Sequence, residues 1–279
     1  MTNRRNFLKA AGIGLAATAL PGLANAAGSS SAGKKNKFNF ELGVASYSLR
    51  EFDREQALEM TVRCGVDRIC FKSMHLPLDS DEAEIKKAVA DCKEKGVALY
   101  GGGVIYMKSK DDVDQAFEYA KTAGMDMIVG VPNHELLSYV EGKVKEYDIK
   151  LAIHNHGPGD DLYPSAESAY NLMKNMDKRM GLCIDIGHTK RIDRDPEQDV
   201  KDYFDRVHDI HIKDVTAAKP EGKTCIIGRG VIDFKSFLKA VEELGYKGTL
   251  ALEYEADGND PLPGMMESFG YIRGILATM

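Results

Sequence analysis

The sequence predicts a one-domain α/β protein in which eight parallel strands close into a (β/α)8 barrel. Between residues 39 and 279, short apolar runs alternate with amphipathic helical patterns until eight strand and helix pairs are complete. In the last run, Thr249 and Ala251 share one face with Glu253 and Glu255, so small side chains lie beneath two carboxylates, as expected inside a closed barrel. An open doubly wound sheet is the alternative, but no Gly-x-Gly-x-x-Gly follows the first strand.

The expected strands are short, and several helices have recognisable start and stop signals. Asp53 and Gln56 have capping-box spacing, and Gly65, Gly96 and Gly124 end the first three helices. Strands are predicted at residues 40–46, 66–72, 97–103, 127–131, 150–155, 182–186, 207–213 and 249–254. Helices are predicted at about 53–65, 81–95, 111–123, 134–147, 165–176, 196–204, 233–244 and 264–276, with a charged connection at 190–197 and a long loop from 214 to 231.

The first 26 residues are expected to be a twin-arginine-type signal peptide. Arg4 and Arg5 precede an apolar stretch at 10–20, and residues 24–26 read Ala-Asn-Ala, which is typical of a signal peptidase site. The apolar stretch is too short and too rich in Gly and Ala for a membrane anchor. We therefore expect export to the periplasm or beyond, with residues 27–38 as a flexible leader and 39–279 as the barrel.

Composition limits the classes of partner. The formal net charge of −6 argues against nucleic acid, and no membrane association is expected once the signal is removed. The five cysteines are odd in number and contain no Cys-x-x-Cys pair, so a disulfide framework is not expected. A small-molecule substrate is the expected partner, and the sequence allows a homo-oligomer.

Four predicted strands end in residues that bind metals. Residues 181–188 read GLCIDIGH, in which an apolar strand runs into Asp185, and three other strands place His154, His211 and Glu253 at matching positions. Each residue alone would more often be a helix cap or a hydrogen-bonded polar side chain. Because the carboxyl ends of barrel strands meet at one end, we expect all four to converge on one divalent metal ion that offsets the repulsion of the two carboxylates.

Mixed imidazole and carboxylate ligation favours Mn²⁺ or Zn²⁺, with Co²⁺ or Fe²⁺ also suitable, over Ca²⁺ and Mg²⁺. Four protein ligands would leave coordination positions on the ion for substrate, which indicates a catalytic site. Other polar residues at the same strand ends suit a polyhydroxylated or carbonyl ligand. The residues expected to bind substrate are Lys72, His75, Asn155, His188 and Lys213, and the candidate proton-transfer residues are His156, Glu253 and Glu255.

The strand ends LAIHNHG, LCIDIGHT, VHDIHIKD and LALEYE, in that order, resemble the xylose isomerase-like TIM barrels, a superfamily of sugar isomerases and epimerases with apurinic-endonuclease relatives. The resemblance covers nearly all of 39–279 and implies a divalent metal, often Mn²⁺, bound by His154, Asp185, His211 and Glu253. In the ketose isomerases and epimerases the strand-five ligand is usually a glutamate that pairs with the strand-eight glutamate in proton transfer. This chain has His154 there.

The resemblance implies, first, a metal-dependent sugar isomerase or epimerase that polarises a carbonyl and removes the α-proton. The alternative is a metal-dependent lyase that cleaves 3-keto-glycosides by β-elimination, which a histidine-rich site would serve equally well. A further alternative is a sugar-binding barrel without turnover. An endonuclease is disfavoured, because such enzymes need a basic face.

Overall fold

The computed structural model describes residues 37–279. The predicted signal peptide at 1–26, and residues 27–36 of the predicted leader, lie outside the described residues, so both stay predictions. Within 37–279 none of the helices combines the length and the apolar character needed to cross a bilayer.

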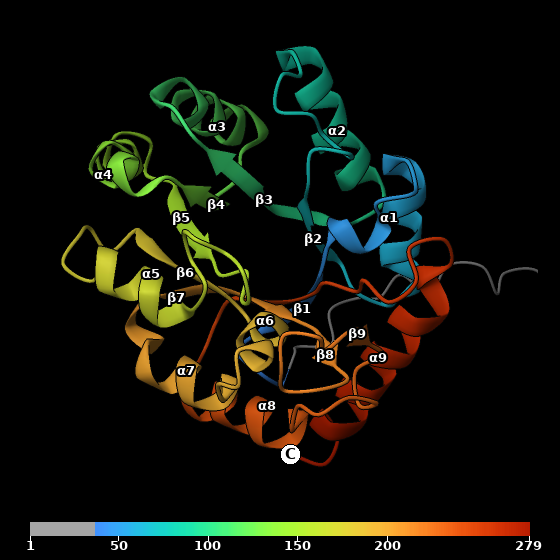
Figure 1. The fold of residues 1–279 in the computed structure, drawn as a ribbon. Helices are drawn as coiled ribbons and strands as arrows, with labels where there is room; N and C mark the ends of the chain where they lie inside the picture. Colours follow the sequence, from blue (N-terminus) through green and yellow to red (C-terminus); the bar gives the residue numbers. More distant parts are fainter. Residues whose placement is uncertain (1–36) are drawn as a thin grey trace, which may run out of the picture. The chain divides into compact units, whose positions relative to one another are not determined.

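Eight parallel strands form a closed barrel, as predicted. Each strand pairs with two neighbours, and the order around the barrel is β1-β10-β7-β6-β5-β4-β3-β2. Figure 1 shows the strands as an inner ring surrounded by helices. The strands are β1 (Glu41–Ala45), β2 (Arg68–Phe71), β3 (Ala98–Met107), β4 (Met127–Pro132), β5 (Lys150–His154), β6 (Met180–Asp185), β7 (Val207–Ile212) and β10 (Thr249–Leu252).

The helices of the outer ring begin at side-chain caps that satisfy their first N–H groups. Asp53 and Gln56 form the predicted capping box, and Ser109 and Ser165 start two further helices in the same way. The helices are α1 (Arg54–Arg63), α2 (Glu82–Glu94), α3 (Lys110–Ala123), α4 (Leu137–Tyr147), α5 (Ala166–Met173), α6 (Ile186–Arg191), α7 (Pro196–Asp202), α8 (Phe234–Glu243) and α9 (Pro261–Leu276), with 3-10 turns at Ser46–Leu49, His134–Leu136 and Phe204–Arg206.

Three local predictions were wrong. β3 continues to Met107, four residues beyond its predicted end at 103. α6 begins directly after β6, where no helix was expected before the connection at 190–197. The segment after β7, predicted only as a long loop, contains a two-stranded antiparallel sheet of β8 (Asp214–Val215) and β9 (Thr224–Cys225).

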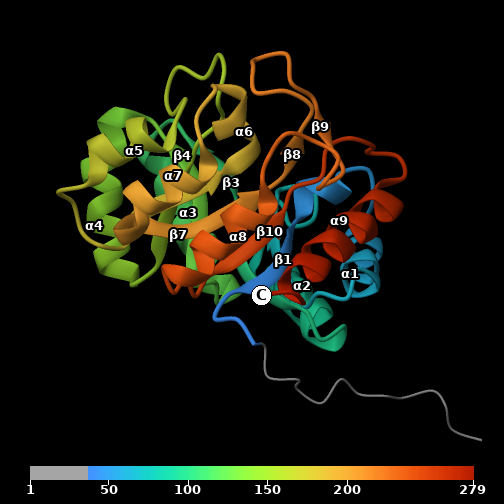
Figure 2. The same ribbon diagram turned by 90° about the horizontal axis from the view of Figure 1, so that it is seen from below.

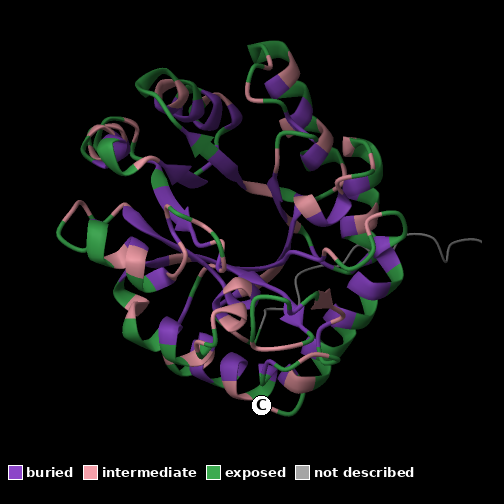
Figure 3. Ribbon diagram, in the orientation of Figure 1, coloured by how far each residue is buried: buried purple, intermediate pink, exposed green. Residues whose placement is uncertain are grey.

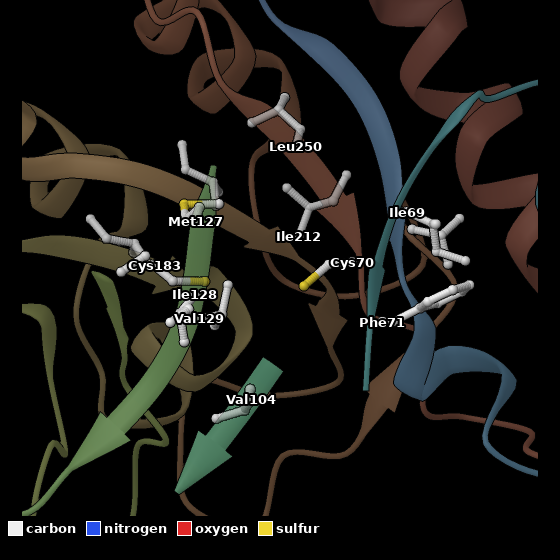
Figure 4. Close-up of a cluster of buried hydrophobic side chains, with 14 of the residues drawn as sticks. Ile69, Cys70, Phe71, Val104, Met127, Ile128, Val129, Cys183, Ile212 and Leu250 are labelled. Carbon is white, nitrogen blue, oxygen red and sulfur yellow. The ribbon is translucent and has the colours of Figure 1, made fainter. Parts of the chain in front are cut away.

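Period-two alternation separates the barrel interior from the layer beneath the helices. On β2, Cys70 points to the opposite side of the strand from Ile69 and Phe71 (Figure 4). The strands are almost wholly buried, whereas the outer faces of the helices are exposed (Figure 3). Apolar packing therefore holds the strands in place. Polar side chains can be accommodated on the inward faces near the carboxyl ends of the strands, where (β/α)8 barrels have their active sites.

Asp214 anchors the β8–β9 hairpin. Its buried carboxylate accepts hydrogen bonds from the backbone N–H groups of Val215, Gly228, Gly230 and Ile232, at 2.9 to 3.2 Å. Figure 2 shows the hairpin and the loop that follows β5 at the same end of the barrel. The two longest loops therefore flank the end at which the strands finish.

Candidate metal centre

His154, Asp185, His211 and Glu253 converge at the carboxyl end of the barrel. Three of them lie at or near the ends of β5, β6 and β7, and Glu253 directly follows β10. The pairing register sets Asp185 opposite His211, which brings side chains from separate strands to one level. One ligand atom from each of the four lies within 4.8 Å of the others, and all four residues are buried.

The distances define a compact group of donors. Nε2 of His154 is 3.2 Å from Nδ1 of His211 and 3.6 Å from Oδ2 of Asp185, and the same Nδ1 is 3.5 Å from Oε2 of Glu253. Oδ2 of Asp185 is buried and has no hydrogen bond of good geometry in the described part of the chain, although the Lys213 ammonium lies 3.0 Å away. Two imidazoles and two carboxylates fit a divalent cation of the Mn²⁺ or Zn²⁺ kind.

Burial and charge set the protonation states. Burial lowers the pKa of His154 to about 3, which leaves a neutral imidazole suited to a metal. Burial opposes protonation of His211 too, but the carboxylates of Glu253 and Asp209 outweigh it and raise the pKa of His211. Burial likewise opposes ionisation of Asp185 and Glu253, yet the Lys213 ammonium holds the pKa of both carboxyls below the ordinary value.

Lys213 lies inside this group. Its Nζ is 3.0 Å from Oδ2 of Asp185 and 2.7 Å from Oε2 of Glu253, and it also bonds the carboxylate of Glu255. Only 2% of its side chain is exposed. A β-carbon on Gly187 would lie 2.2 Å from Cγ of Lys213, so the glycine of the DIGH motif makes room for the lysine stem.

His156 stands beside the four candidate ligands with two partners of its own. Its Nε2 is 3.1 Å from the Tyr106 hydroxyl, and its Nδ1 is 3.5 Å from Oδ2 of Asp160. The ring centroids of His156 and His154 are 4.6 Å apart. Burial lowers the pKa of His156, so the imidazole is neutral at pH 7.

Of the five residues predicted to bind substrate, two face the centre and a third lies at the end of β2. The first two are Lys213 and His188: the His188 ring lies 6.0 Å from that of His154, and burial lowers the pKa of His188 to about 4. Lys72, with Nζ 3.4 Å from the Val104 carbonyl, lies half-buried at the end of β2.

The other two predicted substrate residues bond the protein itself. Asn155 accepts a hydrogen bond from the Asp185 N–H at 3.0 Å and so braces the end of β6. Both ring nitrogens of His75 have protein partners, at 2.9 Å from the Ser46 hydroxyl and 3.2 Å from the Leu49 carbonyl. Neither residue offers its full hydrogen-bonding capacity to a ligand.

Tyr106, Asp160 and Asp209 were not among the predicted site residues. Tyr106 was missed because its strand was predicted to end at 103, and Asp160 lies in a loop without a pattern. Asp209 could have been found, since in VHDIHIKD it shares the inward face of His211 and Lys213 by alternation.

The chain matches a family model described as xylose isomerase-like TIM barrel over residues 56–275. The matched range contains all four candidate ligands and every other residue described above as facing the centre.

Curated relatives match shorter segments. The rhizopine catabolism protein MocC of Rhizobium meliloti is 28% identical over 144 residues, which cover 46% of this chain and 44% of the relative. An inosose dehydratase of Salmonella typhimurium is 31% identical over 134 residues, or 42% of this chain and 44% of that enzyme. The match thus spans less than half the length of each relative.

Solved structures share the fold over most of the chain. A D-tagatose 3-epimerase-like protein superposes with a TM-score of 0.71 at 19% identity, over 86% of this chain and 98% of the other. A 3-keto-D-glucoside 4-epimerase from E. coli superposes with a TM-score of 0.68 at 13% identity, over 84% and 99%. At these identities the likeness shows the fold alone.

Proposed function

We propose, since this chain belongs to the xylose isomerase-like TIM barrel family, that it is a divalent-metal-dependent enzyme that removes the proton beside the carbonyl of a sugar or keto-sugar. The observation that carries the proposal is the buried group of His154, Asp185, His211 and Glu253, whose ligand atoms lie within 4.8 Å of one another. A divalent ion bound there would act as a Lewis acid on a substrate carbonyl and so acidify the neighbouring C–H.

His156 is the base that the geometry favours. It is neutral, and its Nε2 is available to a substrate proton once the exposed Tyr106 side chain moves aside. Asp160, 3.5 Å from Nδ1, would orient the ring and stabilise the imidazolium formed after proton transfer. By contrast, Lys213 binds both Glu253 and Glu255, so neither carboxylate is a free base in this arrangement.

One free base favours elimination over epimerisation. An epimerase returns a proton to the opposite face of the carbon and uses a second acid or base there, whereas β-elimination needs one base and a hydrogen-bond donor to the departing oxygen. The Lys213 ammonium can serve as that donor. The inosose dehydratases among the curated relatives support the same class, so we propose a lyase acting on a β-oxygenated keto-sugar such as a 3-keto-glycoside.

An isomerase or epimerase is the second candidate. It is favoured by Glu255, which is only half-buried and could become the second base if its contact with Lys213 were released. A sugar-binding barrel without turnover is the outcome if neither reaction occurs.

Incubation in D₂O separates these functions. The Mn²⁺-loaded protein is mixed with a 3-keto-glucoside or with a free ketose, and the products are followed by NMR. Elimination releases the aglycone, whereas epimerisation introduces deuterium beside the carbonyl without release. His156→Ala and Glu253→Gln should each abolish the reaction, and His208→Gln, at the start of β7, should not. A His156→Ala variant that still exchanges the α-proton would remove His156 as the base.

We also propose that the protein is exported. The twin-arginine-like segment supports this proposal. The acidic barrel of the mature protein would then meet glycosides outside the cytoplasm. Fusion of residues 1–38 to a reporter that is active only in the periplasm tests it, with Arg4→Lys and Arg5→Lys together as the variant expected to retain the reporter inside the cell.

A further inference from the structure

Asp209 lies one level below the candidate metal centre and on the same face of β7 as His211. It is completely buried, and the register sets it opposite Cys183 on β6. It therefore forms part of the floor of the site and is too deep to touch a substrate above His211.

The contacts of Asp209 leave its charge poorly compensated. Its Oδ2 accepts a hydrogen bond from the Tyr100 hydroxyl at 3.3 Å and a weak one from the Cys183 thiol at 3.8 Å. Its Oδ1 is buried without a hydrogen-bond partner in the described residues. Both donors are neutral, so burying this carboxylate costs free energy that packing alone would not require.

His211 is a further neighbour of Asp209. Nε2 of His211 is 3.6 Å from Oδ2 of Asp209, beyond hydrogen-bond distance, and has no hydrogen-bond partner among residues 37–279. Nδ1 points the other way, to His154 and Glu253, at 3.2 and 3.5 Å. The two ring nitrogens thus face two different environments, a carboxylate below and the group of candidate ligands above.

In alkaline solution, or as a metal ligand, the His211 imidazole is neutral and carries its single N–H on one of these nitrogens. With the N–H on Nε2, the ring donates toward Asp209 and presents the Nδ1 lone pair to the centre. With the N–H on Nδ1, a lone pair would face the buried carboxylate and a hydrogen would block the centre. A carboxylate behind a metal-binding histidine generally fixes the tautomer in this way.

We propose that Asp209 is a positioning residue that holds His211 in its Nε2–H tautomer and so directs the Nδ1 lone pair at a bound divalent ion. The inference rests on the proposed function, in which His211 is a ligand. Tyr100 and Cys183 hold the carboxylate in place by donating to the same oxygen that faces His211.

The test uses Asp209→Leu and Asp209→Asn in the full chain. Leucine fills similar space but cannot accept a hydrogen bond, whereas the asparagine oxygen can. Replacing an incompletely bonded buried charge with an apolar side chain is often neutral or stabilising, so the leucine variant should fold and resist urea at least as well as the wild type. Its affinity for Mn²⁺ should nevertheless fall by about 10- to 100-fold, as for other residues behind metal ligands.

Two readouts separate positioning from packing. Binding of Mn²⁺ alone is measured by the EPR signal of the free ion, and the tautomer of His211 is measured in metal-free, ¹⁵N-histidine-labelled protein by long-range ¹H–¹⁵N correlation in alkaline buffer, with His211→Gln to assign the signal. We expect the Nε2–H form in the wild type, its retention in Asp209→Asn with intermediate affinity, and its loss in Asp209→Leu. Tyr100→Phe, which removes a donor but keeps the carboxylate, should retain the wild-type tautomer.

Failure of the proposed role of Asp209 can be distinguished from failure of the proposed function. A leucine variant with the wild-type tautomer and the wild-type affinity for Mn²⁺ would overturn the role of Asp209. A wild-type protein that binds no Mn²⁺, but whose His211 changes tautomer on substitution of Asp209, would leave the positioning role standing and remove the metal from the proposed function.

Discussion

Lys213→Met tests the charge balance of the candidate centre. Methionine keeps a flexible stem of similar length in the space above Gly187 and removes only the ammonium. Three carboxylates, Asp185, Glu253 and Glu255, then lose the cation they share. Asp185 and Glu253 are buried, so water cannot screen them.

The size of the effect follows from that burial. Removing one partner of a buried ion pair costs about 3–5 kcal/mol, because the remaining charge is left uncompensated. We therefore expect the metal-free variant to unfold with a free energy about 3–5 kcal/mol below that of the wild type. An ion at 100 times its dissociation constant adds about 2.7 kcal/mol to stability. Because the ion no longer competes with the ammonium for Asp185 and Glu253, the variant should regain more stability from Mn²⁺ than the wild type gains.

Urea denaturation followed by circular dichroism, with EDTA or with Mn²⁺, measures both quantities. The matched control is Lys87→Met, which removes a lysine of 61% side-chain exposure paired with Asp91 at 2.9 Å. That surface pair should contribute about 0–1 kcal/mol and should not respond to Mn²⁺. If metal-free Lys213→Met were as stable as the wild type, or if both gained equally from Mn²⁺, the idea that an ammonium and a metal compensate the same carboxylates would be refuted.

Three further predictions concern Gly187, His208 and Asp214. Gly187→Ala should displace the Lys213 stem and cost roughly 1–3 kcal/mol by urea denaturation, because the new β-carbon would lie 2.2 Å from Cγ. Burial lowers the pKa of His208 to about 4, so below pH 6.5 the unfolded chain binds a proton that the folded chain does not. The free energy of unfolding, measured with urea, should therefore fall as the pH drops from 6.5 toward 4. The fall should be less steep in His208→Gln. Asp214→Asn loses part of its acceptor capacity for four N–H groups, and should speed proteolysis within 216–230; unchanged cleavage would contradict its anchoring role.

Much of the fold was predictable because each element carried its own signal. Apolar runs and capping residues located eight strands and most helices, and alternation placed His154, Asp185, His211 and Glu253 on inward faces. A closed barrel then leaves one place where the ends of β5, β6, β7 and β10 meet. The convergence of these four side chains is therefore a consequence of topology, which short-range patterns are sufficient to indicate.

The contacts between side chains were not predictable in the same way. Alternation puts Lys213 on the face of His211, but whether its ammonium turns back to Asp185 depends on the space above Gly187 and on where α6 begins. Lys72 and His75 follow the same strand end, yet His75 is bonded to Ser46 and Leu49 in the neighbouring turn. Strand ends thus indicate which residues gather, whereas the partners of each residue depend on tertiary geometry.

Asp185 is both a helix cap and a candidate metal ligand, one role for each carboxylate oxygen. An aspartate at a strand end is commonly a helix cap, and here Oδ1 accepts the His188 N–H at 2.8 Å and starts α6. Oδ2 faces His154 at 3.6 Å and the Lys213 ammonium at 3.0 Å. The cap fixes the carboxylate plane, and the ammonium pairs with the second oxygen, so that oxygen is held toward the candidate ligands. The short helix that the sequence failed to predict is therefore the element that aims this residue at the proposed ion.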